Sequence, residues 1–128
     1  MKQDQLSGAV ADAWGRKTAR AIAAELGAEM KSQTSNEATF KGEHIVIKCA
    51  APATDSVGVT FKMLDRLDSI VAAFQRDDGS FELWSLPADK FLREMRDTRS
   101  TGTSAGKVGL VRKDAFEKHG VIITRVTL

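Results

Sequence analysis

The segment Asn36–Ala51, NEATFKGEHIVIKCAA, constrains the fold of this chain most strongly, because it predicts two short strands joined in a hairpin at Lys41-Gly42. Side chains alternate along a strand, so the second strand has two faces. One face carries His44, Val46 and Lys48, and the other carries Glu43, Ile45, Ile47 and Cys49. Lys48 follows an apolar run, and an ammonium group there costs free energy unless an anion or water meets it.

Length and composition predict a single domain over residues 1–128. The chain is 42% hydrophobic and 28% charged, which is enough apolar material for one core. Its formal net charge of +2 is too small to indicate a nucleic-acid or membrane partner by itself. The single cysteine, Cys49, cannot form an intramolecular disulfide, and no charged-then-apolar leader precedes the first predicted helix. Because no apolar run approaches membrane-spanning length, we expect an intracellular, cytoplasmic protein.

Apolar residues recur at helical spacing at the start of the chain. They predict a long amphipathic helix from Asp4 to Leu26, ended by Gly27, with Trp14 in the core. A short strand at Ala28–Gln33 then precedes the hairpin. We expect the long helix to pack its apolar stripe on a sheet.

Shorter elements follow the hairpin. They are a helix capped at Thr54-Asp55-Ser56 and ending near Asp68, strands at Ile70–Phe74 and Phe81–Leu86 joined by Asp77-Asp78-Gly79, a short helix after Pro87, a polar loop at Thr98–Gly106, a strand at Val108–Val111, a helix at Asp114–His119 and a strand at Val121–Leu128. This mixture predicts an α/β fold with a central mixed sheet flanked by helices, and β/α additions at its C-terminal end.

The order helix, three short strands, helix, strand, with Lys48 near the end of the third strand, resembles the core of the PD-(D/E)xK superfamily of restriction-endonuclease-like nucleases. The resemblance covers roughly residues 4–75. In that superfamily, an acid on the second strand and an acid two positions before the lysine bind a divalent metal, and the lysine helps to position or activate the attacking water. The resemblance implies Lys48 and Glu37 as catalytic residues, and Glu37 with Glu25 of the first helix as ligands of Mg²⁺.

One position departs from that pattern. The residue two places before Lys48 is Val46, and one carboxylate with water makes a weak site for Mg²⁺, which takes oxygen ligands. Two interpretations remain open. The chain is either a divergent nuclease that recruits an acid from Glu25 or Glu29, or a catalytically silent relative that keeps the fold.

Positive charge is concentrated between Lys90 and Lys113, where seven basic residues accompany two acidic ones. The polar loop rich in Gly, Ser and Thr lies inside this segment, and its hydroxyls, amides and cations suit nucleic-acid phosphates. The candidate nucleic-acid-binding residues are Arg96, Arg99, Lys107 and Arg112. The alternative is a solvated surface loop without a ligand.

Two functions from different classes follow. The first is a nucleic-acid-binding protein of nuclease-like fold, acting on DNA, either as a divergent metal-dependent nuclease or as an inactive relative. The second is a non-enzymatic interaction or accessory subunit, whose apolar strand edge or first helix docks a partner. In either case the last predicted strand, VIITRVTL, is a candidate edge for a homodimer.

Overall fold

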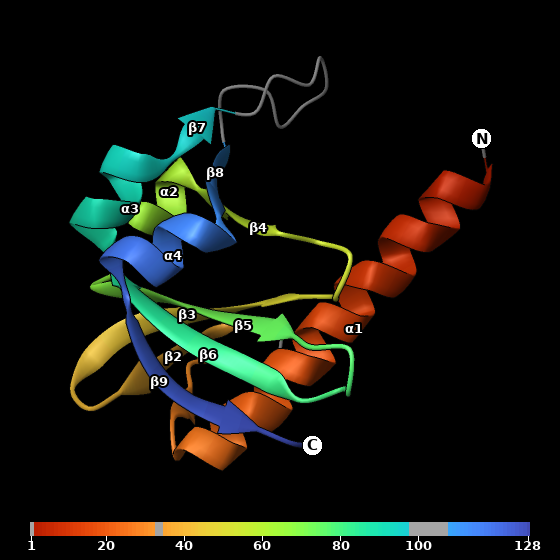
Figure 1. Ribbon diagram of the computed structural model, residues 1–128, viewed down its shortest axis with the longest axis horizontal. Coiled ribbons are helices and arrows are strands. Elements are labelled where there is room, and N and C mark those ends of the chain that lie inside the picture. The colour runs from red at the N-terminus through yellow and green to blue at the C-terminus, as the bar shows by residue number, and fades with distance from the viewer. Residues whose placement is uncertain (1, 33–34, 98–107) are drawn as a thin grey trace.

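The computed structural model describes residues 2–32, 35–97 and 108–128 (Figure 1). In chain order the elements are α1 (Lys2–Leu26), β1 (Glu29–Met30), β2 (Glu37–Phe40), β3 (Glu43–Ala50), β4 (Ser56–Thr60), α2 (Phe61–Leu64), β5 (Ser69–Gln75), β6 (Phe81–Pro87), α3 (Ala88–Glu94), β7 (Arg96–Asp97), β8 (Val108–Arg112), α4 (Lys113–His119) and β9 (Val121–Val126). No helix in the described ranges is long and apolar enough to cross a membrane.

Six of the described strands form a mixed main sheet in the order β1-β2-β3-β5-β6-β9. Only β3 and β5 run parallel among its paired strands, and the other pairs are antiparallel. The helix α1 packs on one face of this sheet, while the helices α2, α3 and α4 lie on the other side (Figure 1). The predicted single α/β domain with a central mixed sheet is therefore confirmed.

The hairpin predicted at Lys41-Gly42 is present between β2 and β3. Both turn residues have positive φ, 51° for Lys41 and 80° for Gly42, which is the turn geometry that matches the twist of two-residue hairpins. The register pairs Glu37 with Val46, so these two side chains project from the same face of the sheet. This register sets the geometry of the candidate site.

The helix predicted from Thr54-Asp55-Ser56 to Asp68 is wrong over its first half. Residues 56–60 form the strand β4, and only one helical turn, α2, follows it. Val57 and Val59 are buried at alternate positions, because β4 pairs with β8 about 50 residues later in the chain. That distant pairing, together with β-branched side chains, outweighed the local helical spacing.

A second sheet was not predicted. The strands β4, β8 and β7 form a three-stranded small sheet in that order. Its inner side chains, Val57, Val59 and Val111, are buried against the main sheet. The polar loop predicted at Thr98–Gly106 lies outside the described residues.

The core has two parts, one on each face of the main sheet. Between α1 and the sheet, Ile22 and Ala23 pack with Ile45 and Ile47, and Trp14 joins this cluster with its ring 6.3 Å from that of Phe81. The prediction of Trp14 as a core residue is thus confirmed.

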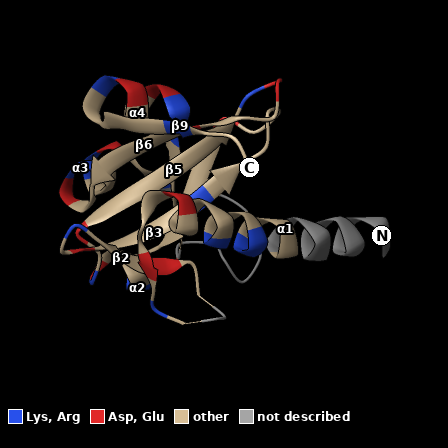
Figure 2. Ribbon diagram, turned by 90° about the horizontal axis from the view of Figure 1, so that it is seen from below, with Lys and Arg blue, Asp and Glu red and all other residues tan. Residues whose placement is uncertain are grey.

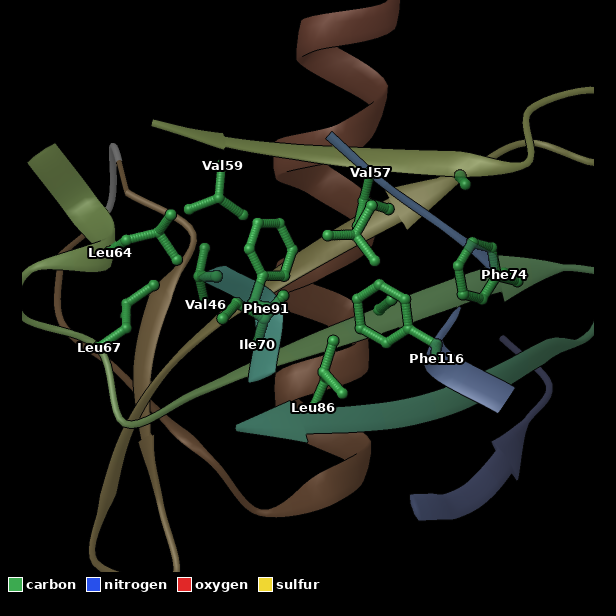
Figure 3. Close-up of a cluster of buried hydrophobic side chains, with 13 residues drawn as sticks. Val46, Val57, Val59, Leu64, Leu67, Ile70, Phe74, Leu86, Phe91 and Phe116 are labelled. Carbon is green, nitrogen blue, oxygen red and sulfur yellow. The ribbon is translucent and has the colours of Figure 1, made fainter. Parts of the chain in front are cut away.

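On the opposite face, α3 and α4 each insert one fully buried phenylalanine, Phe91 and Phe116 (Figure 3). The Phe116 ring packs edge-on against Phe74 of β5 at 5.7 Å and against Phe91 at 6.3 Å. These aromatic contacts attach the two short helices to the sheet.

Gly120 joins α4 to β9 at a position with no room for a side chain. A Cβ there would lie 2.6 Å from the carbonyl oxygens of both Phe116 and Ser85. Replacing Gly120 by alanine is therefore expected to lower the free energy of unfolding by about 1–3 kcal/mol, because backbone would have to move. The matched control is Gly15→Ala on α1, where a Cβ meets nothing within 4 Å and should stabilise the helix by about 0.5–1 kcal/mol. Chemical denaturation of both variants measures the contrast, and equal stabilities would contradict it.

Candidate functional site

The carboxylate of Glu37 lies on the face of β2 and β3 from which Lys48 also projects, and it forms hydrogen bonds with three other side chains. The residue is only 8% exposed. Arg66 donates to it twice, from Nε to Oε1 at 2.9 Å and from Nη2 to Oε2 at 2.7 Å. His44 Nε2 lies 2.8 Å from Oε1, and the Ser35 hydroxyl donates to Oε2 at 3.4 Å. A buried carboxylate with a guanidinium, an imidazole and a hydroxyl is fully satisfied.

Local hydrogen bonds hold the start of β2 in this position. The Ser35 hydroxyl accepts from the backbone N–H of Glu37 at 3.0 Å, which is a turn contact typical of serine. Asn36 forms two hydrogen bonds with Ile47 of β3. Its Nδ2 donates to the Ile47 carbonyl at 3.1 Å, and its own backbone carbonyl accepts from the Ile47 N–H at 3.0 Å. Glu37 is therefore presented from a strand end that side chains and backbone both anchor.

Arg66 reaches Glu37 from the connection between α2 and β5. That connection is tied to β3, because the His44 N–H donates to Asp68 Oδ2 at 2.8 Å and the Asp68 N–H donates to the His44 carbonyl at 2.8 Å. The helix α2 is itself capped by Thr60, whose hydroxyl accepts from the Met63 N–H. Arg66 therefore extends from an anchored loop, with its side chain half exposed.

These contacts decide the charge state of Glu37. The hydrogen bonds from Arg66 lower its pKa to about 2, against the opposing effect of burial and with further lowering from the charges of Arg66 and His44. The carboxylate is ionised at neutral pH and can only accept hydrogen bonds, so the nearby His44 Nε2 carries the proton between them.

The Mg²⁺ ion implied by the resemblance requires oxygen ligands with free lone pairs. Both oxygens of Glu37 already accept hydrogen bonds from a cation, and its cross-strand neighbour is the fully buried Val46. Glu25 is exposed on α1, which packs on the opposite face of the main sheet. Among the described residues, no group of three or more His, Cys, Asp or Glu is placed to hold a metal ion. This donor set fits Mg²⁺ poorly.

Lys48 projects from the same face of β3 as Val46, and therefore from the same face as Glu37 on β2. It is half-buried and lies opposite Ala72 of the parallel strand β5. The Glu37 carboxylate turns toward His44 and Arg66, at the beginning of β3, whereas Lys48 lies two residues beyond Val46 toward the end of that strand. The two predicted catalytic residues, Glu37 and Lys48, project from the same face of the sheet, but they lie toward opposite ends of β3.

The predicted nucleic-acid-binding residues divide into two groups. Arg96 of β7 pairs with Leu110 of β8, and Arg112 follows two residues later on the same face. Both arginines are exposed, on the outer face of the small sheet. The Arg112 guanidinium also lies near two carboxylates, with Nη2 3.8 Å from Asp55 Oδ2 and Nε 3.9 Å from Asp114 Oδ1. Arg99 and Lys107 lie outside the described residues.

Two charged clusters were missed by sequence reasoning. Arg66 was not singled out, although a strand acid that becomes buried needs a cation and Arg66 lies near the end of the helix predicted to stop at about Asp68. The second is centred on Glu82 of β6, which is 6% exposed and accepts from Trp84 Nε1 at 2.8 Å and from the guanidinium groups of Arg76 at 3.0 Å and Arg125 at 3.3 Å. The Trp84 hydrogen bond is the largest cause that lowers its pKa. The Arg66 contacts tie the α2–β5 connection to β2, whereas the Glu82 contacts join β6 to β9 and to the β5–β6 turn within the main sheet.

Cys49 of β3 is a partly buried free thiol. It lies against the α1-side core, and burial raises the pKa of its thiol to about 12. A thiol with that pKa is protonated at neutral pH and a poor nucleophile.

Comparison with known proteins assigns no family. The chain matches no protein-family model, and no curated protein matches it at a significant level.

Proposed function

We propose that this protein binds nucleic acid through its small sheet and that its nuclease-like core does not catalyse metal-dependent cleavage. The order of α1, β1, β2, β3, α2 and β5 supports the nuclease-like core, with β4 as an addition between β3 and α2. The shared face of Glu37 and Lys48 on adjacent strands also supports it. These are the strands on which the resemblance expects an acid and a lysine.

One observation carries the proposal that cleavage is silent: Arg66 binds both oxygens of Glu37. A guanidinium supplies a fixed positive charge where the resemblance expects a metal ion. With valine at position 46, the second carboxylate that would attract a divalent ion is missing from the strand. The ion pair between Arg66 and Glu37 therefore takes the place of a hydrated Mg²⁺ ion.

Nucleic-acid binding is supported by the outer face of the small sheet. Arg96 and Arg112 stand exposed there on the strands that flank residues 98–107, which add Arg99 and Lys107 to the same stretch of sequence. Elsewhere, basic and acidic segments alternate over the molecule, as on α4 (Figure 2). A local excess of cations suits a chain of phosphates even when the net charge is close to zero.

Binding to duplex DNA is therefore expected to weaken steeply as salt rises, with a log–log slope of about −0.9 for each phosphate contact. The double variant Arg96→Ala/Arg112→Ala should make this slope shallower by up to about two, because each lost cation no longer releases a counterion. Fluorescence anisotropy at several salt concentrations measures the slope.

The matched control removes two exposed cations from α3 and α4, Arg93→Ala/Lys118→Ala, and carries the same change in net charge. It should keep the wild-type slope. A parallel variant, Arg99→Ala/Lys107→Ala, tests the remaining two predicted contacts. Equal effects of the control and Arg96→Ala/Arg112→Ala would show that net charge alone governs binding, and no wild-type binding at low salt would reject the proposed function.

The proposed absence of metal-dependent DNA cleavage is tested separately. Wild-type protein incubated with DNA and Mg²⁺ or Mn²⁺ should leave as much intact substrate as Lys48→Ala, because Glu37 is held by Arg66. Gel analysis of labelled DNA over time measures this. Cleavage by the wild type that is lost in Lys48→Ala would identify an active nuclease and contradict the silent assignment.

A further inference from the structure

A groove of about 280 Å³ lies at the end of the main sheet where the β2–β3 turn approaches the start of β9. Its apolar lining consists of Phe40, Ile45, Val71, Val121, Ile122 and Ile123. Several of these residues belong to the core on the α1 side of the sheet. The groove therefore gives access from solvent to an apolar surface continuous with the core.

The first residues of β9 are unusually exposed for their type. Val121 is 68% exposed and Ile122 is 46% exposed, and they are adjacent in a strand. The register places Val121 opposite Ser85, on the face of the sheet that carries the groove, whereas Ile122 lies opposite Trp84 and projects from the other face. A highly exposed β-branched residue beside an apolar groove is a feature of interaction sites.

β9 is also an edge strand. It pairs with β6 on one side, and no strand of the described residues pairs with its other side. The opposite edge strand of the sheet, β1, is only two residues long, whereas β9 has six residues and no proline. Short edges resist pairing with another chain, and longer apolar edges invite it.

The rim of the groove carries one charge of each sign on the same hairpin. Lys41 and Glu43 are both exposed and both line the groove. In a two-fold symmetric contact, the same patch meets itself, so residue i of one copy faces residue j of the other and the reverse. A patch with a cation and an anion side by side is complementary to its own copy, because Lys41 of each chain can face Glu43 of the other.

We propose that the groove and the exposed start of β9 form a symmetric dimer interface with a second copy of this chain. Val121 of each copy occupies the groove of the other, and the two Lys41–Glu43 pairs flank it. The proposal does not depend on nucleic-acid binding, since the groove residues and the arginines on the small sheet are different sets.

The first test is the mass in solution, measured by sedimentation or light scattering over a range of concentrations. Wild type is expected to be dimeric, and Val121→Arg/Ile122→Arg monomeric. The matched control is Leu92→Arg on α3, a residue 48% exposed and outside the groove lining, which should remain dimeric. Circular dichroism confirms that each variant is folded. A monomeric wild type at the highest soluble concentration would overturn the proposal, as would a dimer unaffected by the double arginine variant.

A charge exchange tests the orientation without altering the apolar surface. Lys41→Glu and Glu43→Lys should each weaken dimerisation by about tenfold, because each places like charges across the two-fold axis. Mixing the two variants should restore wild-type affinity in a heterodimer, where both pairs are again of opposite sign. A mixture that associates no better than either variant alone would exclude this arrangement.

Discussion

Replacing Phe116 by alanine is expected to lower the free energy of unfolding by about 3–5 kcal/mol. Phe116 is fully buried, and its ring packs edge-on against those of Phe74 and Phe91. Its removal costs the transfer of the ring, the cavity left behind and two aromatic contacts. Domains of this size are stable by only about 5–15 kcal/mol, so the loss is a large fraction of the total.

Denaturation in urea, followed by the fluorescence of Trp14 and Trp84, measures this loss. Leu92→Ala is the control, because Leu92 lies on α3 beside the same layer but is 48% exposed, and it should change stability by less than about 0.5 kcal/mol. Phe116→Leu should fall between the two, since it restores part of the volume. A loss below about 1 kcal/mol for Phe116→Ala would show that α4 is not held by this contact.

Acid is expected to destabilise the protein through Glu37. The folded-state pKa of about 2 lies below the ordinary value of 4.5, so the stabilisation is fully present above about pH 4.5 and is lost as pH falls toward 2. A difference of this size corresponds to at most about 3 kcal/mol, and solvent around the half-exposed Arg66 reduces it. Glu37→Gln should therefore be clearly less stable than wild type at pH 7, and the difference should shrink with acid.

The measurement is unfolding free energy of wild type and Glu37→Gln between pH 7 and the lowest pH at which both fold. Glu117→Gln, an exposed carboxylate on α4, is the control and should change stability at pH 7 by less than about 0.5 kcal/mol. A double-mutant cycle with Glu37→Gln and Arg66→Gln measures the coupling between these two side chains. The loss of stability in the double variant should be smaller than the sum of the losses in the two single variants. A wild-type-to-Gln difference that stays constant with pH would contradict the ion pair.

Most elements of the fold were accessible from local sequence. The hairpin at Lys41-Gly42 follows from turn chemistry, and α1 follows from helical spacing ended by Gly27, whose φ is 75°. In both cases the deciding contacts lie between residues close together in the chain. The two-residue strand β7 is too short to leave a pattern of its own.

The error at residues 56–60 has a different origin. Val57, Phe61 and Leu64 are spaced for a helix, but Val57 and Val59 are also spaced for a strand, and local pattern does not choose between them. The choice came from pairing with β8, which buries both valines. Long-range pairing of this kind is invisible until the partner strand is placed.

The candidate site shows the same division. Sequence by itself determined which charged residues exist, that Glu37 and Lys48 lie on adjacent strands, and that valine stands two places before the lysine. Only the tertiary structure decided which charges meet. Arg66 reaches Glu37 across 29 residues, because the register of β2 on β3 and the anchoring of Asp68 to His44 bring the two together. A carboxylate's environment depends on groups brought in by folding, so a strand acid that looks like a metal ligand in sequence becomes the buried half of an ion pair.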